Sequence, residues 1–374
     1  MELYARKVEC LFLRLILHIC INQQCEVKWC NKCSNFFTVQ NRVRQGDVSS
    51  GTFFAIYVDK LFVLLRKTGV GCHINGAFCG TMIFADDTFL LSASRNGLQV
   101  VDICAKLLYV RNLKFGTNTD PIKSKTKSIM FTKKLKPNCE PLNITLNGNQ
   151  LPWVRQVNHL GHILQSDNSM TLDIAQKRGI FIAKVNSLLQ EFYFVTPDVL
   201  IKLMRTYAFS IYGSNTWDIY SKGCEKLHTS FNVAIRQMLS IDRCTHRYMI
   251  ESLSECLHLK TELASRYVSF YRSLQCSKKF PVRFLARLCE NDQRTCLGRT
   301  LARLAADTGL RMDELSKLTA NLVKRKLPYW PLPDAEKWRI PLCKELLALR
   351  ADELFLDGFS ADEREEILKY ACIS

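Results

Sequence analysis

The chain has 374 residues, and its 52 Lys and Arg against 35 Asp and Glu give a formal net charge of +17. Hydrophobic residues make up 47% of the chain and charged residues 23%. These proportions are ordinary for a globular protein, so a wholly disordered chain is excluded. The length is enough for roughly two or three domains, each with its own core.

The positive charge is unevenly distributed along the chain. From Pro341 onward there are 4 basic and 8 acidic residues, so the basic excess lies before this acidic tail. Such an excess favours a polyanionic partner, because binding releases counterions and the charge steers the encounter. Charge alone leaves two kinds of partner open, a nucleic acid and an acidic membrane surface.

The cysteines and the N-terminal apolar run bear on the compartment. The 17 cysteines are scattered from Cys10 to Cys372, without the paired spacing of a secreted disulfide framework. We therefore expect an intracellular protein, in the nucleus or the cytoplasm, that is not secreted. Arg14 and His18 interrupt the apolar run at 11–19, which is also shorter than the ~20 residues that span a bilayer. We interpret this run as an amphipathic core helix and expect no membrane partner.

Short strands and helices alternate over the first 165 residues. Apolar residues at helical spacing predict helices, and short apolar runs between polar turns predict strands. Asn147-Gly148 predicts a tight hairpin, because both residues tolerate positive φ. In chain order we predict a helix and an extended segment within 1–37, a helix at 53–66, a strand, turn and strand at 81–91, a helix at 98–109, a strand at 128–131, the hairpin at 144–151 and one strand at 157–164.

From Ser169 onward the pattern becomes helical. Thr196 followed by Pro197 is typical of an N-cap and the first helical residue. Further helices are predicted at 222–240, 248–275 and 298–325, before prolines at 328, 331 and 333 and a last helical pair. We therefore predict an α+β fold in three parts, 1–165, 166–280 and 281–374.

Two adjacent carboxylates, Asp86 and Asp87, lie between two short apolar runs. Neighbouring side chains on a regular strand point to opposite faces, but at a tight turn both can approach one cation. Two-metal phosphoryl transfer uses such hard oxygen ligands to hold Mg²⁺. An Asp-Asp pair is also common in solvated turns that have no function. The apolar flanks predict a buried hairpin and so favour the metal site over this alternative.

Two polar loops offer groups for a nucleotide or a nucleic acid. The loop at 42–47 contains Gln45 and Gly46 and opens onto a helix, where backbone amides and arginines can hold phosphates or a base edge. The loop at 123–127 is basic and is followed by further lysines at 133, 134 and 136. Such lysines suit a phosphate backbone or a pyrophosphate leaving group. A solvated charged loop is the alternative for both.

The order of these motifs resembles the palm of a reverse transcriptase, especially that of non-LTR retrotransposons. The resemblance is carried by Arg44-Gln45-Gly46-Asp47, Phe84-Ala85-Asp86-Asp87, the loop at 123–127 and Leu160-Gly161. Two later stretches, 210–218 and 245–248, resemble the thumb and the region after it. The resemblance covers roughly residues 10–290. It implies a partial palm, with a small antiparallel sheet and helices, followed by an all-helical thumb and C-terminal region.

The resemblance implies a role for each matched residue. The reaction would be attack by a primer 3′-hydroxyl on the α-phosphate of a dNTP, with Mg²⁺ as cofactor, an RNA template and a DNA primer. By position, Asp86 and Asp87 would bind the metal, Phe84 would lie against the nucleotide or the primer end, Gln45 and Gly46 would contact the template base and the nucleotide, Lys125 would lie near the triphosphate, and Leu160 and Gly161 would grip the primer.

The sequence also departs from the family. There, a further metal-binding aspartate lies on a strand upstream of the Gln-Gly loop, after a fingers region. Before Arg42 the acidic residues are Glu2, Glu9 and Glu26, and none lies in a similar sequence. If the metal held by that aspartate supplies about 4 kcal/mol, its loss slows the reaction roughly a thousandfold. We therefore expect a reverse transcriptase whose activity is impaired.

Two alternatives to a working enzyme stay open. The chain can be a catalytically inactive retroelement remnant that only binds RNA or a primer–template. It can also be a truncated palm that does not fold, because its sheet lacks a strand and exposes an open edge. Binding without primer extension supports the first alternative, and a cooperative thermal melt excludes the second.

Overall fold

The computed structural model describes residues 2–21, 24–38, 49–94, 96–118, 120, 122–132, 143–254, 256 and 258–315. The fold combines helices with short antiparallel hairpins, which confirms the predicted α+β class. The chain divides into two compact units: unit 1 is Met1–Ser128 with Asn138–Trp153, and unit 2 is Ile129–Pro137 with Val154–Ser374. The finer division into palm, thumb and C-terminal region stays a prediction.

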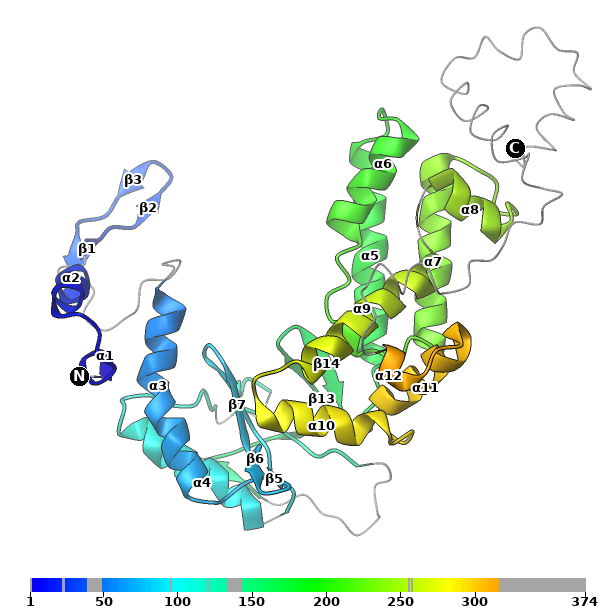
Figure 1. Cartoon of the computed structure of the whole chain (residues 1–374). Coiled ribbons are helices and arrows are strands. Elements are labelled where there is room, and N and C mark those ends of the chain that lie inside the picture. The colour runs from blue at the N-terminus through cyan, green and yellow to red at the C-terminus, as the bar shows by residue number, and fades with distance from the viewer. Residues whose placement is uncertain are drawn as a thin grey trace, which may run out of the picture. The chain divides into compact units, whose positions relative to one another are not determined.

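Unit 1 contains helices and a series of two-stranded hairpins (Figure 1). Its helices are α1 (Glu2–Ala5), α2 (Cys10–Ile21), α3 (Ser50–Lys67) and α4 (Gln99–Tyr109), with a 3₁₀ turn at Asn96–Leu98. Its hairpins pair β1 (Gln24–Cys25) with β4 (Phe37–Thr38), β2 (Lys28–Trp29) with β3 (Lys32–Cys33), β5 (His73–Ile74) with β6 (Ala77–Phe78), β7 (Thr81–Phe84) with β8 (Asp87–Leu90), and β10 (Thr145–Leu146) with β11 (Asn149–Gln150). Strands β9 (Ser128–Ile129) and β12 (Trp153–Val154) lie where the chain leaves this unit.

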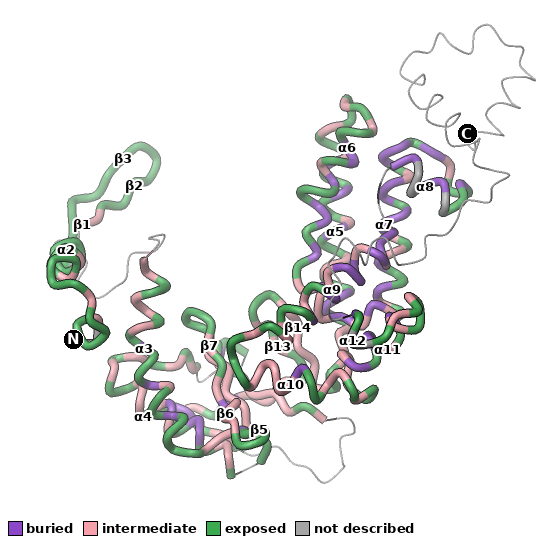
Figure 2. Tube along the Cα trace, viewed as in Figure 1, coloured by how far each residue is buried: buried purple, intermediate pink, exposed green. Residues whose placement is uncertain are grey.

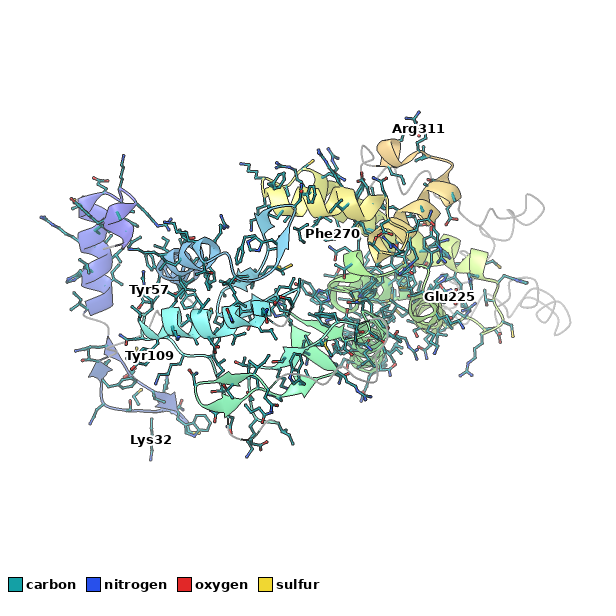
Figure 3. All side chains as sticks on the ribbon, turned by 90° about the horizontal axis from the view of Figure 1, so that it is seen from below. Lys32, Tyr57, Tyr109, Glu225, Phe270 and Arg311 are labelled. Carbon is teal, nitrogen blue, oxygen red and sulfur yellow. The ribbon has the colours of Figure 1, made fainter. Side chains whose placement is uncertain are left out.

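The core of unit 1 forms between α3, α4 and the β10–β11 hairpin. The predicted Asn147-Gly148 turn is confirmed, with φ values of 52° and 78°. Tyr57 of α3 is labelled in Figure 3. Its hydroxyl donates a hydrogen bond to the Arg111 carbonyl oxygen at 2.7 Å, just beyond the end of α4. Leu90, the last residue of β8, packs against this core, which therefore fixes the base of the β7–β8 hairpin. The buried residues are Leu61, Leu65, Val100, Val101, Cys104, Leu146 and Leu151.

The N-terminal apolar run forms a helix, α2, as predicted, but the prediction that it lies in a core is wrong. Leu11 is 72% exposed and Ile19 is 55% exposed. Apolar side chains lie all round this helix instead of along one stripe, so one packing face cannot bury them. None of the helices in the described part of the chain is long and apolar enough to cross a membrane.

Unit 2 contains one hairpin and a helical assembly. The hairpin pairs β13 (Gln156–His159) with β14 (His162–Gln165). The helices are α5 (Thr171–Glu191), α6 (Pro197–Leu203), which continues into a π-helical turn at Met204–Ala208, a 3₁₀ turn at Ser214–Thr216, α7 (Lys222–Leu239), α8 (Arg247–Ser254), α9 (Leu259–Gln275), α10 (Phe280–Glu290), α11 (Cys296–Thr308) and α12 (Met312–Leu315).

Long apolar side chains from α5, α7 and α9 build the core of unit 2. Figure 2 shows the buried positions of this unit gathered along these helices. Phe181 of α5, Leu227 of α7 and Val268 of α9 are nearly or fully buried, and so is Trp217 in the segment before α7. Burying side chains of this size contributes about 1.5–3 kcal/mol each. This core supports the β13–β14 hairpin and the stretch 210–218 of the same unit.

Three predicted elements of unit 2 differ in the structure. The strand predicted at 157–164 is the β13–β14 hairpin. The helix predicted at 248–275 is interrupted, because His258 caps α9: its Nδ1 accepts a hydrogen bond from the Lys260 amide at 3.2 Å. α10 was not predicted as a separate helix. The helix predicted at 298–325 ends as α11 at Gly309, which has a φ of 65°, and the predictions beyond 315 lie outside the described residues.

Candidate functional site

The two adjacent aspartates lie at the tip of the β7–β8 hairpin. Phe84 pairs with Asp87 in the strand register, which leaves Ala85 and Asp86 as a two-residue turn. Ala85 has a φ of 52°, in the left-handed region that non-glycine residues rarely adopt. Two-residue hairpin turns usually place Gly, Asn or Asp at such a position. Ala85 is therefore a strained choice, and backbone strain of this kind is concentrated at functional sites.

The hairpin tip is exposed, so the prediction of a buried hairpin is wrong. Phe84 is 66% exposed and Met82 is 52% exposed, and Asp86 and Asp87 are also exposed. The apolar runs alternate between two faces, and one face carries Met82 and Phe84 into solvent. Phe84 and Asp87 are directly opposite one another, so their side chains share that face. The tip thus presents an aromatic ring beside a carboxylate.

Backbone hydrogen bonds hold the root of the same hairpin. The Cys72 amide donates to the Leu91 carbonyl oxygen at 3.0 Å, and the Leu91 amide donates to the Gly80 carbonyl oxygen at 2.8 Å. A Cβ at Gly80 would lie 2.8 Å from the Phe78 ring, so the ring packs closely against the glycine. The β5–β6 hairpin and the Leu90 contact therefore fix the root while the tip stays open to solvent.

The basic loop at 123–127 is ordered by its own backbone. The buried Ser124 donates from its hydroxyl to the Thr126 carbonyl oxygen at 2.8 Å, and the Thr126 amide donates to the Gly116 carbonyl oxygen at 2.9 Å. Lys123, Lys125 and Lys127 alternate with these residues and are exposed. The loop thus presents its lysines to solvent from a fixed backbone.

The donor set at the hairpin tip suits Mg²⁺ only in part. Asp86 and Asp87 offer hard oxygen ligands, and Mg²⁺ is commonly bound by one or two carboxylates together with substrate phosphates. Within the described residues, no three His, Cys, Asp or Glu side chains are grouped as a metal site. Gln45, Gly46 and the rest of the predicted loop at 42–47 lie outside the described residues, as do the lysines at 133, 134 and 136.

The predicted primer-grip residues form the turn of the β13–β14 hairpin. Leu160 has a φ of 47° and Gly161 a φ of 76°, so both central residues are left-handed, as in a type I′ turn. Leu160 is an unusual residue for that conformation. The Lys177 ammonium group of α5 donates to the Gly161 carbonyl oxygen at 2.7 Å. The turn is therefore fixed to α5 by a charge-assisted hydrogen bond.

Two stretches that were matched separately in the sequence meet at this turn. Gly213, in the stretch 210–218, has a φ of 81°, and a Cβ there would lie 1.8 Å from Cε1 of His162. A Cβ at Gly161 would lie 3.4 Å from the Tyr212 ring, and the His162 and Tyr212 rings are 5.2 Å apart. The stretch 210–218 thus packs directly against the β13–β14 turn.

A buried carboxylate organises this junction. Asp173 of α5 is fully buried and accepts hydrogen bonds from Nε1 of Trp217 at 2.8 Å and from the Ile163 amide at 3.0 Å. Nδ1 of His162 lies 3.3 Å from the same carboxylate. Sequence reasoning missed Asp173. An acidic residue in the first turn of a helix is common because it interacts favourably with the helix N-terminus, so its position does not indicate a buried hydrogen-bonding role.

Two exposed tyrosines each lie beside a lysine of α5. Tyr207 is 62% exposed and Tyr212 is 61% exposed. The Lys184 ammonium group donates to the Tyr207 carbonyl oxygen at 2.9 Å, and that of Lys177 lies 5.7 Å from the centre of the Tyr212 ring. Lys177 and Lys184 are seven residues apart and lie on one face of α5. We call these four residues the Lys177–Tyr207 surface.

No protein-family model matches the chain, and no curated protein matches its sequence. The reverse-transcriptase resemblance therefore depends on the sequence motifs and their order.

Proposed function

We propose that this chain contains the palm and thumb of a non-LTR retrotransposon reverse transcriptase, in which Asp86 and Asp87 bind Mg²⁺ for nucleotidyl transfer. The observation that carries the proposal is the β7–β8 tip, where a two-residue turn presents both carboxylates beside an exposed Phe84. A turn that only reversed the chain would favour Gly or Asn at the position of Ala85. The strained alanine supports a tip shaped by function.

The side chains at the tip have the chemical groups that a protein contributes to nucleotidyl transfer. The two carboxylates would hold Mg²⁺, which stabilises the charge on the reacting phosphate and orients the substrate. Phe84, on the same face as Asp87, would pack against the sugar or base of the nucleotide. Lys125, exposed on its ordered loop, would supply a cation for the phosphates of the dNTP.

The Lys177–Tyr207 surface supports nucleic acid as the partner. Proteins that bind single strands combine cations along the phosphate backbone with aromatic rings on which bases stack. Tyr207 and Tyr212 offer such rings, with Lys177 and Lys184 beside them. An RNA template and a DNA primer fit this chemistry and the basic excess of the chain.

A second candidate function is binding of RNA or a primer–template without catalysis. The grouping of carboxylates favours it: a two-metal site needs more ligands than Asp86 and Asp87, and the described part of the chain groups no three candidate ligands. If one metal ion stabilises the transition state by about 4 kcal/mol, its loss would lower the rate roughly a thousandfold. The binding surface would be unaffected by this loss.

Primer extension and filter binding, run side by side, test the two candidates. The proposed enzyme extends a DNA primer on an RNA template with dNTPs and Mg²⁺, and the Asp86→Asn, Asp87→Asn double variant abolishes extension while retaining binding. Asp102→Asn is the matched control, because Asp102 is an exposed carboxylate on α4 of the same unit. Binding without extension by the wild type selects the second candidate. Absence of both activities in a chain that melts cooperatively rejects the two together.

A further inference from the structure

Cys72 and Cys79 are cross-strand neighbours at the base of the β5–β6 hairpin. The strand register pairs His73 with Phe78 and Ile74 with Ala77, and one further step places Cys72 opposite Cys79. The Cys79 amide donates to the Cys72 carbonyl oxygen at 2.8 Å, while the Cys72 amide donates to Leu91, so one of the two bonds of a regular pair joins these residues. Residues opposite one another on antiparallel strands have Cβ atoms about 4.5–5.5 Å apart on one face. A disulfide needs about 3.5–4.5 Å between Cβ atoms, so closing the bond requires a small backbone shift.

The two thiols differ in access to solvent. Both are free, with Cys72 buried and Cys79 half-buried. Burial raises the pKa of Cys79, and the neighbouring Cys72 raises it further, so the Cys79 thiol exchanges slowly at neutral pH. Cys104 of α4 lies in the core of the same unit, and its burial raises its pKa to about 12. Cys104 is therefore an inert thiol by comparison.

The pair lies at the root of the hairpin that carries the aspartates. Cys72 is hydrogen-bonded through its amide to Leu91, which bonds in turn to Gly80, the residue after Cys79. A covalent link between Cys72 and Cys79 would close the β5–β6 hairpin and restrain the root of β7–β8. Closing a loop lowers the conformational entropy of the unfolded chain, so the link would stabilise this region.

We propose that Cys72 and Cys79 form a reversible intramolecular disulfide by exchange with a low-molecular-weight disulfide. The Cys79 thiolate attacks one sulfur of that disulfide, so that a mixed disulfide forms on Cys79 and one small thiolate leaves. The Cys72 thiolate then attacks the Cys79 sulfur and displaces the second small thiolate. Two electrons pass from the cysteine pair to the small disulfide, and the two cysteine protons end on the released thiols. Excess small thiol reverses both steps.

Peptide mass spectrometry of the full chain tests this directly, with oxidised glutathione as the probe. Cleavage after Lys67 and Arg95 releases residues 68–95, which contain Cys72 and Cys79 and no other cysteine. After incubation at mildly alkaline pH and alkylation with N-ethylmaleimide, this peptide should be two hydrogens lighter and carry no alkyl group. Treatment with dithiothreitol before alkylation should restore two alkylated thiols.

Two variants locate the exchange. Cys72→Ser should stop the reaction at the mixed disulfide, so peptide 68–95 keeps one glutathione on Cys79, whereas Cys104→Ser should oxidise like the wild type. The proposal is overturned if peptide 68–95 remains doubly alkylated while the exposed Cys30 and Cys33 become oxidised in the same sample. It is also overturned if either thiol pairs with a cysteine elsewhere in the chain. The readout does not depend on polymerase or binding activity.

Discussion

Asp173 and Trp217 lie 44 positions apart in the chain and are joined by a hydrogen bond of 2.8 Å between the indole Nε1 and the carboxylate Oδ2. Both side chains are fully buried. The same carboxylate accepts the Ile163 amide of β14. It therefore links α5, the β13–β14 hairpin and the segment before α7 through one buried group.

Asp173→Ala should destabilise unit 2 strongly. The change leaves the Trp217 and Ile163 donors without their acceptor, and each buried unsatisfied donor costs about 1–3 kcal/mol. We expect a loss of about 2–5 kcal/mol in the free energy of unfolding, measured by urea denaturation. Asp198→Ala, at an exposed carboxylate in the first turn of α6, is the control and should cost less than about 1 kcal/mol. Equal effects of the two variants would contradict the role of Asp173.

Gly213→Ala should disrupt the packing of 210–218 on the β13–β14 turn. The added Cβ would lie 1.8 Å from Cε1 of His162, at a residue with a φ of 81°. Overpacking and the left-handed backbone together should cost about 2–4 kcal/mol. Gly179→Ala on α5 is the matched control, because a Cβ there meets nothing within 4 Å and should stabilise the helix by roughly 1 kcal/mol. Thermal melts of both variants check the opposite signs.

Stability should fall on acidification because of two buried histidines. The rings of His228 on α7 and His258 at the start of α9 are 4.1 Å apart. Burial, with contributions from His258 and Arg247, lowers the pKa of His228 to about 3. Burial likewise lowers the pKa of His258 to about 4, with contributions from Arg247 and Lys260.

Below the unfolded histidine pKa of about 6.5, the unfolded chain therefore binds more protons than the folded one. The free energy of unfolding should decrease as pH falls from 6.5 toward 4, which urea denaturation across this range measures. His258→Asn retains a side-chain acceptor for the Lys260 amide and removes one of the two groups, so its pH slope should be shallower. A slope identical to that of the wild type would contradict the assignment.

The Lys177–Tyr207 surface should contribute to nucleic-acid affinity if the proposed partner is correct. Lys177→Ala and Lys184→Ala should each weaken binding of a primer–template and reduce the slope of log K against log salt by about 1. Tyr212→Ala should weaken binding through lost stacking, by about 1–3 kcal/mol. Lys222→Ala, at an exposed lysine at the start of α7, is the control. Equal losses from all the lysine variants would indicate general charge attraction instead of this surface.

The sequence predicted the local features that short motifs encode. The hairpin around Asp86 and Asp87 and the Asn147-Gly148 turn follow from residue type and apolar pattern, and both formed as predicted. The exposure of the hairpin tip could not be predicted from the sequence. The alternation along β7 indicates that the strand has two faces, but it does not indicate whether other residues cover both of them.

Contacts between distant segments were also beyond prediction. The Asp173–Trp217 hydrogen bond and the close approach of Gly213 to His162 depend on how α5 and the loop before α7 pack. The helix is interrupted between α8 and α9, where His258 caps α9. The spacing of apolar residues does not predict such a cap. The reverse-transcriptase resemblance named Leu160-Gly161 and the stretch 210–218 as candidates. Only the structure shows that the two segments pack against each other.

Crystallography with Mn²⁺ in place of Mg²⁺, on the chain bound to an RNA template, a DNA primer and a non-hydrolysable dNTP, tests the metal site most directly. We predict an anomalous peak at the β7–β8 tip, within about 2.2 Å of carboxylate oxygens of Asp86 and Asp87, with Gln45 facing the same nucleotide. An ordered tip without a metal, or with Gln45 distant from it while the nucleotide is bound elsewhere, would contradict the proposed site.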